Sequence, residues 1–270
     1  MSDTFTWMGK RVRLIDLSST LSNDTKAFEP NAHDITYVDH RQGMRLGAKI
    51  MNWDDDMTKR VFERGYVWSV EEVRLSTHSG THVDAPYHYG PTMADGSPAA
   101  TIDQVPLRWC FGHGVVLDMR HVDREVGITV PDVEAELQRI GYQLQPYDIV
   151  LVRTDTDKHF HEPRYDFRHP GLRREATKYL VEHGVRMIGI DAWGIDRAFD
   201  VLVKDVLAGK VEFWESHFFG LEQPYSQIEK LANLDQLPEP FGFTVMAFPY
   251  KIRDASAGWT RVVALVEVHD

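Results

Sequence analysis

Apolar residues in this chain fall into short, β-rich runs that polar segments separate. Runs of this length, mostly bounded by Gly, Asp or Pro, are typical of buried strands. They predict strands over Arg11–Leu17, Gly114–Asp118, Ile149–Arg153, Met187–Ile190, Phe243–Pro249 and Val262–Val268. The pattern therefore predicts a large sheet at the centre of the molecule.

Two segments between these runs carry helix signals. The segment Pro131–Ile140 begins with proline and acidic residues and ends at Gly141, while Arg173–His183 ends at Gly184. The order strand, helix, strand predicts an α/β fold, in which polar residues such as Asp191 lie where strands give way to loops.

The chain shows no internal repeat, low-complexity tract or Gly/Ser linker that would mark a domain boundary. We therefore expect one domain over residues 1–270. The segment Met44–Trp68 mixes Trp53, three consecutive aspartates and further charges without a clean period. It is expected to be a surface excursion or a lid.

Composition and charge exclude several classes of partner. The formal net charge of -11 repels phosphate backbones, which argues against nucleic acid as a partner. No apolar stretch approaches the roughly 20 residues that span a bilayer. Cys110 is the single cysteine and the N-terminal segment lacks the apolar run of a signal peptide, so we expect a cytoplasmic protein.

Candidate chemistry is concentrated between Ser76 and His88, where histidines and a carboxylate recur within a few positions. If residues 81–84 are extended, His82 and Asp84 project from the same face, and the intervening glycine lets the backbone fold His78 toward them. Two imidazoles and a carboxylate suit zinc or manganese and leave coordination positions for water and substrate. The alternative is a hydrogen-bonded turn in which Asp84 caps backbone NH groups.

The segment His78-Ser-Gly-Thr-His-Val-Asp-Ala-Pro-Tyr-His88 resembles the HxGTHxDxPxH signature of the cyclase family. This family includes bacterial kynurenine formamidases, isatin hydrolases and proteins named for polyketide cyclisation. Further segments resemble family blocks in the same order: Leu14–Ser18, Ile188–Asp191, Phe248–Lys251 and Arg261–Ala264. The resemblance implies a single α/β domain with a swivelling β/β/α-type core, a mixed or barrel-like sheet and flanking helices. It also implies a homo-oligomer, either a dimer or a tetramer.

The resemblance also implies roles for individual residues. His78, His82 and Asp84 would bind one divalent metal, zinc or manganese, and His88 would transfer protons. In the formamidase branch a later His and Glu, twelve positions apart, bind a second metal, and His217 and Glu229 have that spacing. The isatin hydrolase branch uses one metal, so the number of metal ions per chain, one or two, remains open. Glu222 is an alternative to Glu229 as the carboxylate ligand. His217 and Glu229 could also be a solvated pair that flanks a helix and binds no metal.

The function that follows is hydrolysis of a small amide, formamide or lactam through a metal-activated water, with His88 as the proton-transfer residue. The alternative is a metal-dependent cyclase or dehydratase that acts on an aromatic polyketide or related intermediate. A third alternative is a metal-binding protein without catalysis. Trp193 and Trp259 depart from the family pattern and are candidate substrate contacts, although ordinary packing also explains them.

Overall fold

The computed structural model describes residues 4–25 and 33–268. Contacts divide the chain into two compact units, one formed by residues 1–21 and 77–270 and the other by residues 22–76. We call them the core unit and the insert unit. The α/β fold is built within the core unit, and a single domain over residues 1–270 stays a prediction.

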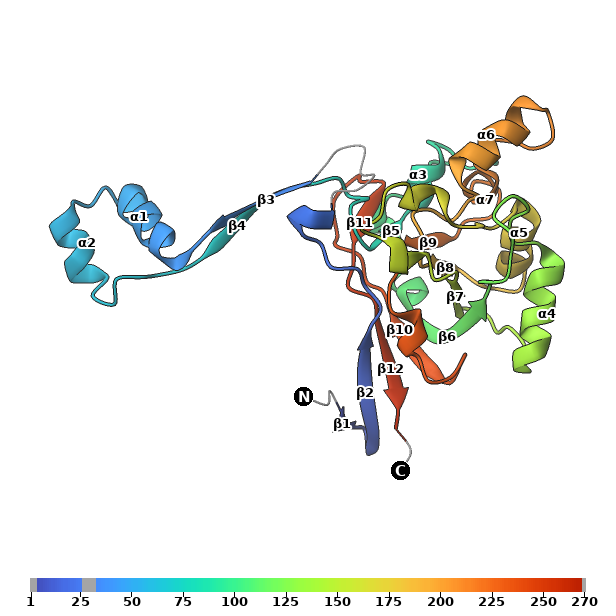
Figure 1. Cartoon of the computed structure of the whole chain (residues 1–270), viewed down its shortest axis with the longest axis horizontal. Helices are drawn as coiled ribbons and strands as arrows, with labels where there is room; N and C mark the ends of the chain where they lie inside the picture. Colours follow the sequence, from blue (N-terminus) through green and yellow to red (C-terminus); the bar gives the residue numbers. More distant parts are fainter. Residues whose placement is uncertain (1–3, 26–32, 269–270) are drawn as a thin grey trace. The chain divides into compact units, whose positions relative to one another are not determined.

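The core unit contains a ten-stranded sheet with the order β1-β2-β12-β10-β6-β7-β8-β9-β5-β11 (Figure 1). Its strands are β1 (Thr4–Trp7), β2 (Lys10–Asp16), β5 (His82–Asp84), β6 (Phe111–Asp118), β7 (Ile149–Arg153), β8 (Met187–Ile190), β9 (Ser226–Glu229), β10 (Phe243–Met246), β11 (Ala257–Trp259) and β12 (Val263–Glu267). Strands β6, β7, β8 and β9 run parallel to one another, and all other neighbouring pairs in the sheet are antiparallel. The predicted mixed sheet is confirmed.

The central strands are buried on both faces, which explains their uninterrupted apolar runs. In β7, Ile149 and Leu151 pack into one core cluster, whereas Val150 and Val152 pack into a second cluster on the opposite face. Alternate residues of a strand point to opposite faces, so a strand covered on both sides is apolar throughout. This is why the sequence pattern locates these strands well.

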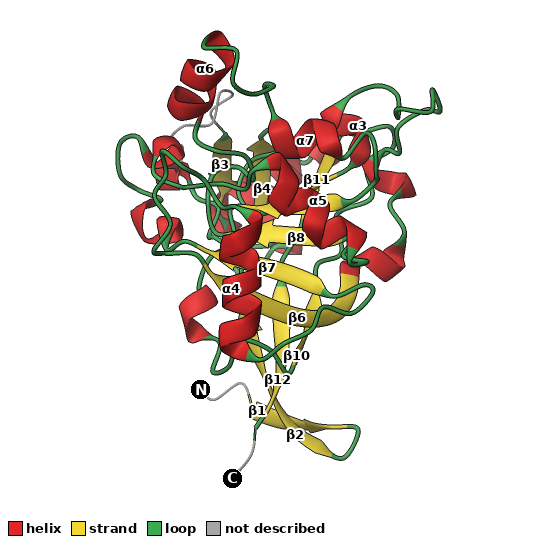
Figure 2. Ribbon diagram, turned by 90° about the vertical axis from the view of Figure 1, so that its right-hand side faces the viewer, coloured by secondary structure: helices red, strands yellow, loops and turns green. Residues whose placement is uncertain are grey.

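Helices cover one face of the parallel strands, where Figure 2 shows α4 and α5 in front of β6 to β8. The helices of the core unit are α3 (Pro86–Tyr89), α4 (Val130–Ile140), α5 (Arg174–Glu182), α6 (Phe199–Leu207) and α7 (Glu215–Phe219). Helix α4 ends where the sequence predicts, since Gly141 adopts the left-handed conformation with φ +68°. None of the described helices has the length and apolar character needed to cross a bilayer.

Short 3-10 segments complete the connections between these elements. They are η1 (Asn23–Thr25), η2 (Ile102–Gln104), η3 (Leu107–Cys110), η4 (Thr156–His159), η5 (Tyr165–Phe167) and η6 (Leu234–Gln236). Two of them, η4 and η5, belong to the long connection that follows β7.

The insert unit shows more regular structure than its sequence predicts. Strands β3 (Asp34–Val38) and β4 (Val70–Arg74) pair antiparallel, and helices α1 (His40–Met51) and α2 (Asp55–Val61) lie between them in sequence. The buried residues of α1 are Gly43 and Gly47, whose missing side chains leave room for Trp68. Glycines give no hydrophobic period, which explains why the helix was not predicted.

Candidate metal centre

The predicted cluster begins at a turn that glycine makes possible. Gly80 has φ +63°, a backbone conformation that residues with a side chain rarely adopt. The turn places the ring of His78 5.0 Å from that of His82, measured between centroids. His82 and Asp84 follow on β5, where both are fully buried. The expected extended strand and the expected role of the glycine are both confirmed.

Hydrogen bonds from distant segments hold this turn in place. The Thr81 hydroxyl donates to the carbonyl of Lys230 at 2.6 Å, and the Lys230 ammonium donates to the carbonyl of His78 at 2.9 Å. The backbone NH of Ser19 donates to Thr81 Oγ1 at 2.8 Å. Lys230 directly follows β9 and Ser19 lies in the segment after β2, so the turn is held by segments that leave the sheet at this end.

The sheet register brings the candidate residues together in two rows. His82 pairs with Glu229 on one side and with Trp259 on the other, while Asp84 pairs with Gln227. Side chains of directly opposed residues, and of residues two apart in a strand, share one face of a sheet. The register therefore explains how Glu229 comes to lie beside His82, which is 147 residues earlier in the sequence.

The first three candidate ligands converge on one point. Asp84 Oδ1 lies 2.9 Å from His78 Nδ1 and 3.2 Å from His82 Nε2. The Nδ1–H of His82 faces the carbonyl of Gly80 at 2.8 Å and donates to it, which leaves the Nε2 lone pair directed at the carboxylate. The other ring nitrogen of His78 lies 3.1 Å from Ser256 Oγ.

Buried polar atoms show that this donor set fits a cation. His82 Nε2 and Asp84 Oδ1 are shielded from solvent, and among the described groups neither has a hydrogen bond of good geometry, although the two histidine nitrogens lie 2.9 and 3.2 Å from Asp84 Oδ1. Such atoms cost free energy unless something else satisfies them. Ligand atoms about 2.0–2.2 Å from a tetrahedral zinc ion lie about 3.3–3.6 Å apart, slightly more than the separations of 2.9 and 3.2 Å seen here. Two imidazoles and one carboxylate also match the chemistry of zinc or manganese.

The pKa shifts of the cluster residues also favour a bound cation. Burial works against an ionised Asp84, but the neighbouring imidazoles, led by that of His82, hold the pKa of this carboxyl well below its usual range. Burial lowers the pKa of His82, which keeps its ring neutral. Burial, followed by the charge of Asp84, raises the pKa of Glu229 well above its usual range. A neutral imidazole and an ionised carboxylate are the forms that bind a metal.

His217 reaches the same cluster from α7. Its Nδ1–H donates to the carboxylate of Asp196, so its Nε2 presents a lone pair. The amide nitrogen of Gln227 lies 2.8 Å from that Nε2, 3.0 Å from Asp84 Oδ2 and 3.0 Å from Glu229 Oε1. The hydroxyl of Tyr225 lies 3.0 Å from Gln227 Oε1 and 3.0 Å from the carbonyl of Ser216, so its one proton is shared between these two acceptors.

His88 lies on α3 at the edge of the cluster, where it is half-buried. Its ring centroid is 4.1 Å from that of His78 and 5.4 Å from those of His217 and Trp214. Burial lowers the pKa of His88 to about 4, so the ring is neutral at pH 7. Trp214 stacks on His217 with centroids 4.4 Å apart and planes inclined by 12°, and it forms an aromatic wall beside both histidines.

The remaining candidates have different surroundings. Glu222 is exposed and forms an ion pair with Arg174 at 2.6 Å, which argues against it as the competing ligand. Trp193 packs against Phe199, with ring centroids 5.2 Å apart. Trp259 pairs with His82 in the sheet register but shares a surface hollow with residues 248–251 and 260–261. The roles of Trp193 and Trp259 in substrate binding stay predictions.

Sequence reasoning missed several residues that shape this site. Gln227, Asp196 and Trp214 contact the candidate ligands, although none of them belongs to the motif between Ser76 and His88. The strand period gave one usable signal, because Gln227 lies two residues before Glu229 and must share its face. Nothing comparable marks Asp196 or Trp214, which follow irregular connections.

A buried histidine behind the cluster makes stability depend on pH. His169 is 1% exposed, and its Nε2–H donates to the carbonyl of Asp196 at 2.9 Å. Burial lowers the pKa of His169 from 6.5 to about 4. The folded state therefore binds fewer protons than the unfolded chain between these values. The stability that this group contributes is present above pH 6.5 and is lost as the pH falls toward 4.

His169→Gln should therefore flatten the pH dependence of stability, since glutamine does not titrate. The loss of unfolding free energy between pH 7 and pH 4 should shrink by up to about 3 kcal/mol. Urea unfolding of metal-free protein at several pH values measures this difference, with the exposed His183→Gln as control. Parallel pH profiles for His169→Gln and the wild type would contradict the assignment.

Comparisons with known proteins agree with the fold. The profile of the family described as "Putative cyclase" matches residues 15–197. A kynurenine formamidase from Erythrobacter litoralis is 30% identical over 234 residues, which cover 83% of this chain and 91% of that relative. The structure of isatin hydrolase A from Ralstonia solanacearum is 25% identical with a TM-score of 0.74, covering 95% of this chain and 92% of that one.

A second solved structure, an isatin hydrolase bound to the product analogue thioisatinate, shares the fold with a TM-score of 0.74 at 22% identity. It covers 95% of this chain and 93% of that one. The family profile spans more than half of the chain and includes the segment from His78 to His88. The chain belongs to the cyclase family.

Proposed function

We propose that this protein is a metal-dependent hydrolase of small amides, formamides or lactams. The observation that carries the proposal is the convergence of His78, His82 and Asp84 on one point, where the buried atoms His82 Nε2 and Asp84 Oδ1 have no hydrogen bond of good geometry among the described groups. These three residues would hold a divalent ion, zinc or manganese. The names of the relatives, kynurenine formamidase and isatin hydrolase, indicate the class of bond that is cleaved.

The chain's own residues supply the proton chemistry. A divalent ion held at the cluster contributes Lewis acidity, which polarises a carbonyl and makes water more acidic. His88 is neutral at pH 7 and lies against His78, so it can accept a proton from water and return it to the leaving nitrogen. Trp214 would limit access of bulk water on the side of His217 and His88.

We further propose that one ion is bound per chain. The acceptor atoms of a second site would be Asp84 Oδ2, His217 Nε2 and Glu229 Oε1, yet all three lie within 3.0 Å of the Gln227 amide nitrogen. The hydroxyl of Tyr225 contacts the other end of the amide, at 3.0 Å from Gln227 Oε1. A second ion would have to displace this buried side chain, whose two N–H groups can donate to two of the three acceptors.

The variant Glu229→Gln tests this stoichiometry. Because the first three ligands are intact, we expect one ion per chain in both the wild type and the variant. Inductively coupled plasma mass spectrometry after reconstitution gives the ratio of metal to protein. Two ions in the wild type that fall to one in the variant would show instead that His217 and Glu229 bind a second metal.

Activity assays test the proposed reaction directly. The purified, reconstituted enzyme is incubated with N-formylkynurenine and with isatin, and the acid released from each is measured. Hydrolysis of either substrate supports the proposal, and the substrate that is cleaved shows whether the enzyme resembles the formamidase or the isatin hydrolase branch. Intact substrates with a fully loaded metal site would contradict it and would favour the alternative of a cyclase or dehydratase.

A further inference from the structure

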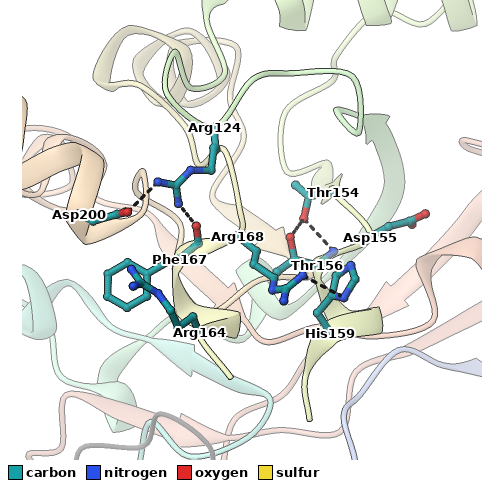
Figure 3. Close-up of a pocket in the computed structure, with 9 residues that line it drawn as sticks. All are labelled: Arg124, Thr154, Asp155, Thr156, His159, Arg164, Phe167, Arg168 and Asp200. Atoms are coloured by element: carbon teal, nitrogen blue, oxygen red, sulfur yellow. Dashed lines mark hydrogen bonds and ion pairs between the residues drawn. The ribbon is translucent and has the colours of Figure 1, made fainter. Parts of the chain in front are cut away.

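A second cavity lies where the parallel strands end, apart from the metal cluster. Its volume is about 480 Å³, which is within the range of small-molecule sites. The lining residues are Arg124, Thr154, Asp155, Thr156, His159, Arg164, Phe167, Arg168 and Asp200 (Figure 3). None of them belongs to the cluster around Asp84. We call this space the arginine cavity.

The topology places the arginine cavity at a preferred ligand-binding position. Arg124 follows β6, the residues from Thr154 to Arg168 follow β7, and Asp200 follows β8. These strands are adjacent and parallel, so their carboxyl ends meet at the same edge of the sheet. Ligands of α/β proteins commonly bind at this edge.

One wall of the cavity is held by buried hydrogen bonds. The side chain of Asp191 accepts from the backbone NH of Thr154 at 2.8 Å, from the Thr154 hydroxyl at 2.6 Å and from the NH of Asp155 at 2.9 Å. The hydroxyls of Thr154 and Thr156 lie 2.7 Å apart. This network fixes the backbone on which the cavity is built.

The charges around the cavity leave one cation in excess. Arg124 pairs with Asp200 at 2.7 Å, and Arg168 pairs with Glu162 at 2.8 Å. The carboxylate of Asp155 pairs with Arg153 and lies 3.5 Å from Arg120. The two carboxylates that line the cavity, Asp155 and Asp200, are therefore both in ion pairs.

Arg164 differs from the other lining arginines. It forms no ion pair with a carboxylate of the described residues, and its guanidinium lies 4.6 Å from the centroid of the Phe167 ring instead. The nearby Asp166 has its pKa raised by burial, which weakens it as a counter-ion. Arg164 is also exposed, so its guanidinium is accessible to an anion from solvent.

We propose that the arginine cavity binds a small aromatic carboxylate. A single excess cation matches a monoanion better than a doubly charged phosphate ester, and a guanidinium can bind both oxygens of a carboxylate. Arg164 would supply the main contact, with His159 and Arg168 on the opposite side, and Phe167 would offer a ring surface to the aromatic part. Arg164 and Arg168 are exposed, so an anion reaches them without opening the core.

Benzoate serves as the probe, and benzamide is its neutral counterpart of similar shape. Isothermal titration calorimetry on the metal-loaded protein should show one benzoate per chain and no binding of benzamide. Arg164→Ala should weaken benzoate binding about tenfold or more, since a charge-assisted hydrogen bond is lost. Arg108→Ala is the matched control, because Arg108 also stacks on a ring, that of Tyr147, but lies outside the cavity.

His82→Ala separates this site from the metal centre, where an anion could bind a metal directly. Benzoate affinity should be unchanged in this variant. Loss of binding in His82→Ala, or unchanged binding in Arg164→Ala, would overturn the proposal, as would the absence of binding to the wild type. Inorganic phosphate that binds more tightly than benzoate, and does so through Arg164, would overturn the assignment to carboxylates.

Discussion

Replacement of His82 by alanine is expected to remove the bound metal and the hydrolytic activity together. His82 is fully buried, and the hydrogen bond from its Nδ1–H to Gly80 leaves Nε2 free to act as a ligand. Without this nitrogen, Asp84 and His78 alone offer too few ligands for tight binding. Turnover should fall to background, and the metal content of the purified variant should fall with it.

Asp84→Ala should have the same effect, because Asp84 carries the negative charge on which both histidines converge. His113→Ala is a suitable control, since His113 is exposed on β6 and contributes nothing to the cluster. Circular dichroism shows whether each variant is folded. Activity retained in a folded, metal-free His82→Ala protein would mean that the reaction does not use this site.

Loss of the His88 ring should separate catalysis from metal binding. His88 is neutral at pH 7 and lies beside the cluster, so it can transfer protons without acting as a ligand. His88→Ala is therefore expected to retain the metal while kcat falls roughly a hundredfold or more, which is the usual contribution of a general acid or base. Steady-state kinetics and metal analysis of the same preparation measure both quantities.

Tyr87→Ala provides the control for this variant, because Tyr87 lies on the same short helix but is exposed. It should retain both metal and turnover. If His88→Ala loses its metal, then His88 is itself a ligand, an arrangement that its proximity to Asp84 and His217 also allows. Unchanged kcat in a metal-loaded His88→Ala enzyme would exclude the proton-transfer role.

The fold was predictable where a strand is buried on both faces, because such a strand is an uninterrupted run of apolar residues. Strands such as β7 and β8 are apolar throughout, and α4 ends at the glycine that its C-terminus requires. The short strands β9 and β11 were not predicted, because three of the four residues of β9 are polar and β11 has only three residues. Helix α1 was missed because its buried face is made of glycine.

The candidate site was predictable to the extent that it is local. The turn and strand between His78 and Asp84 follow from one glycine and the strand period. The proximity of His217 and Glu229 to this segment came from the family resemblance, and the structure supplies its cause in the register of β5 and β9. Gln227 could not be assigned a role beforehand, since its contacts depend on side chains from three elements.

The most direct test of this account is the metal content of the reconstituted wild-type protein and of Asp84→Ala, measured by inductively coupled plasma mass spectrometry. We predict one zinc or manganese ion per wild-type chain and none in Asp84→Ala. A wild-type protein that retains no metal after reconstitution would contradict the central claim, as would an Asp84→Ala variant that binds metal as the wild type does.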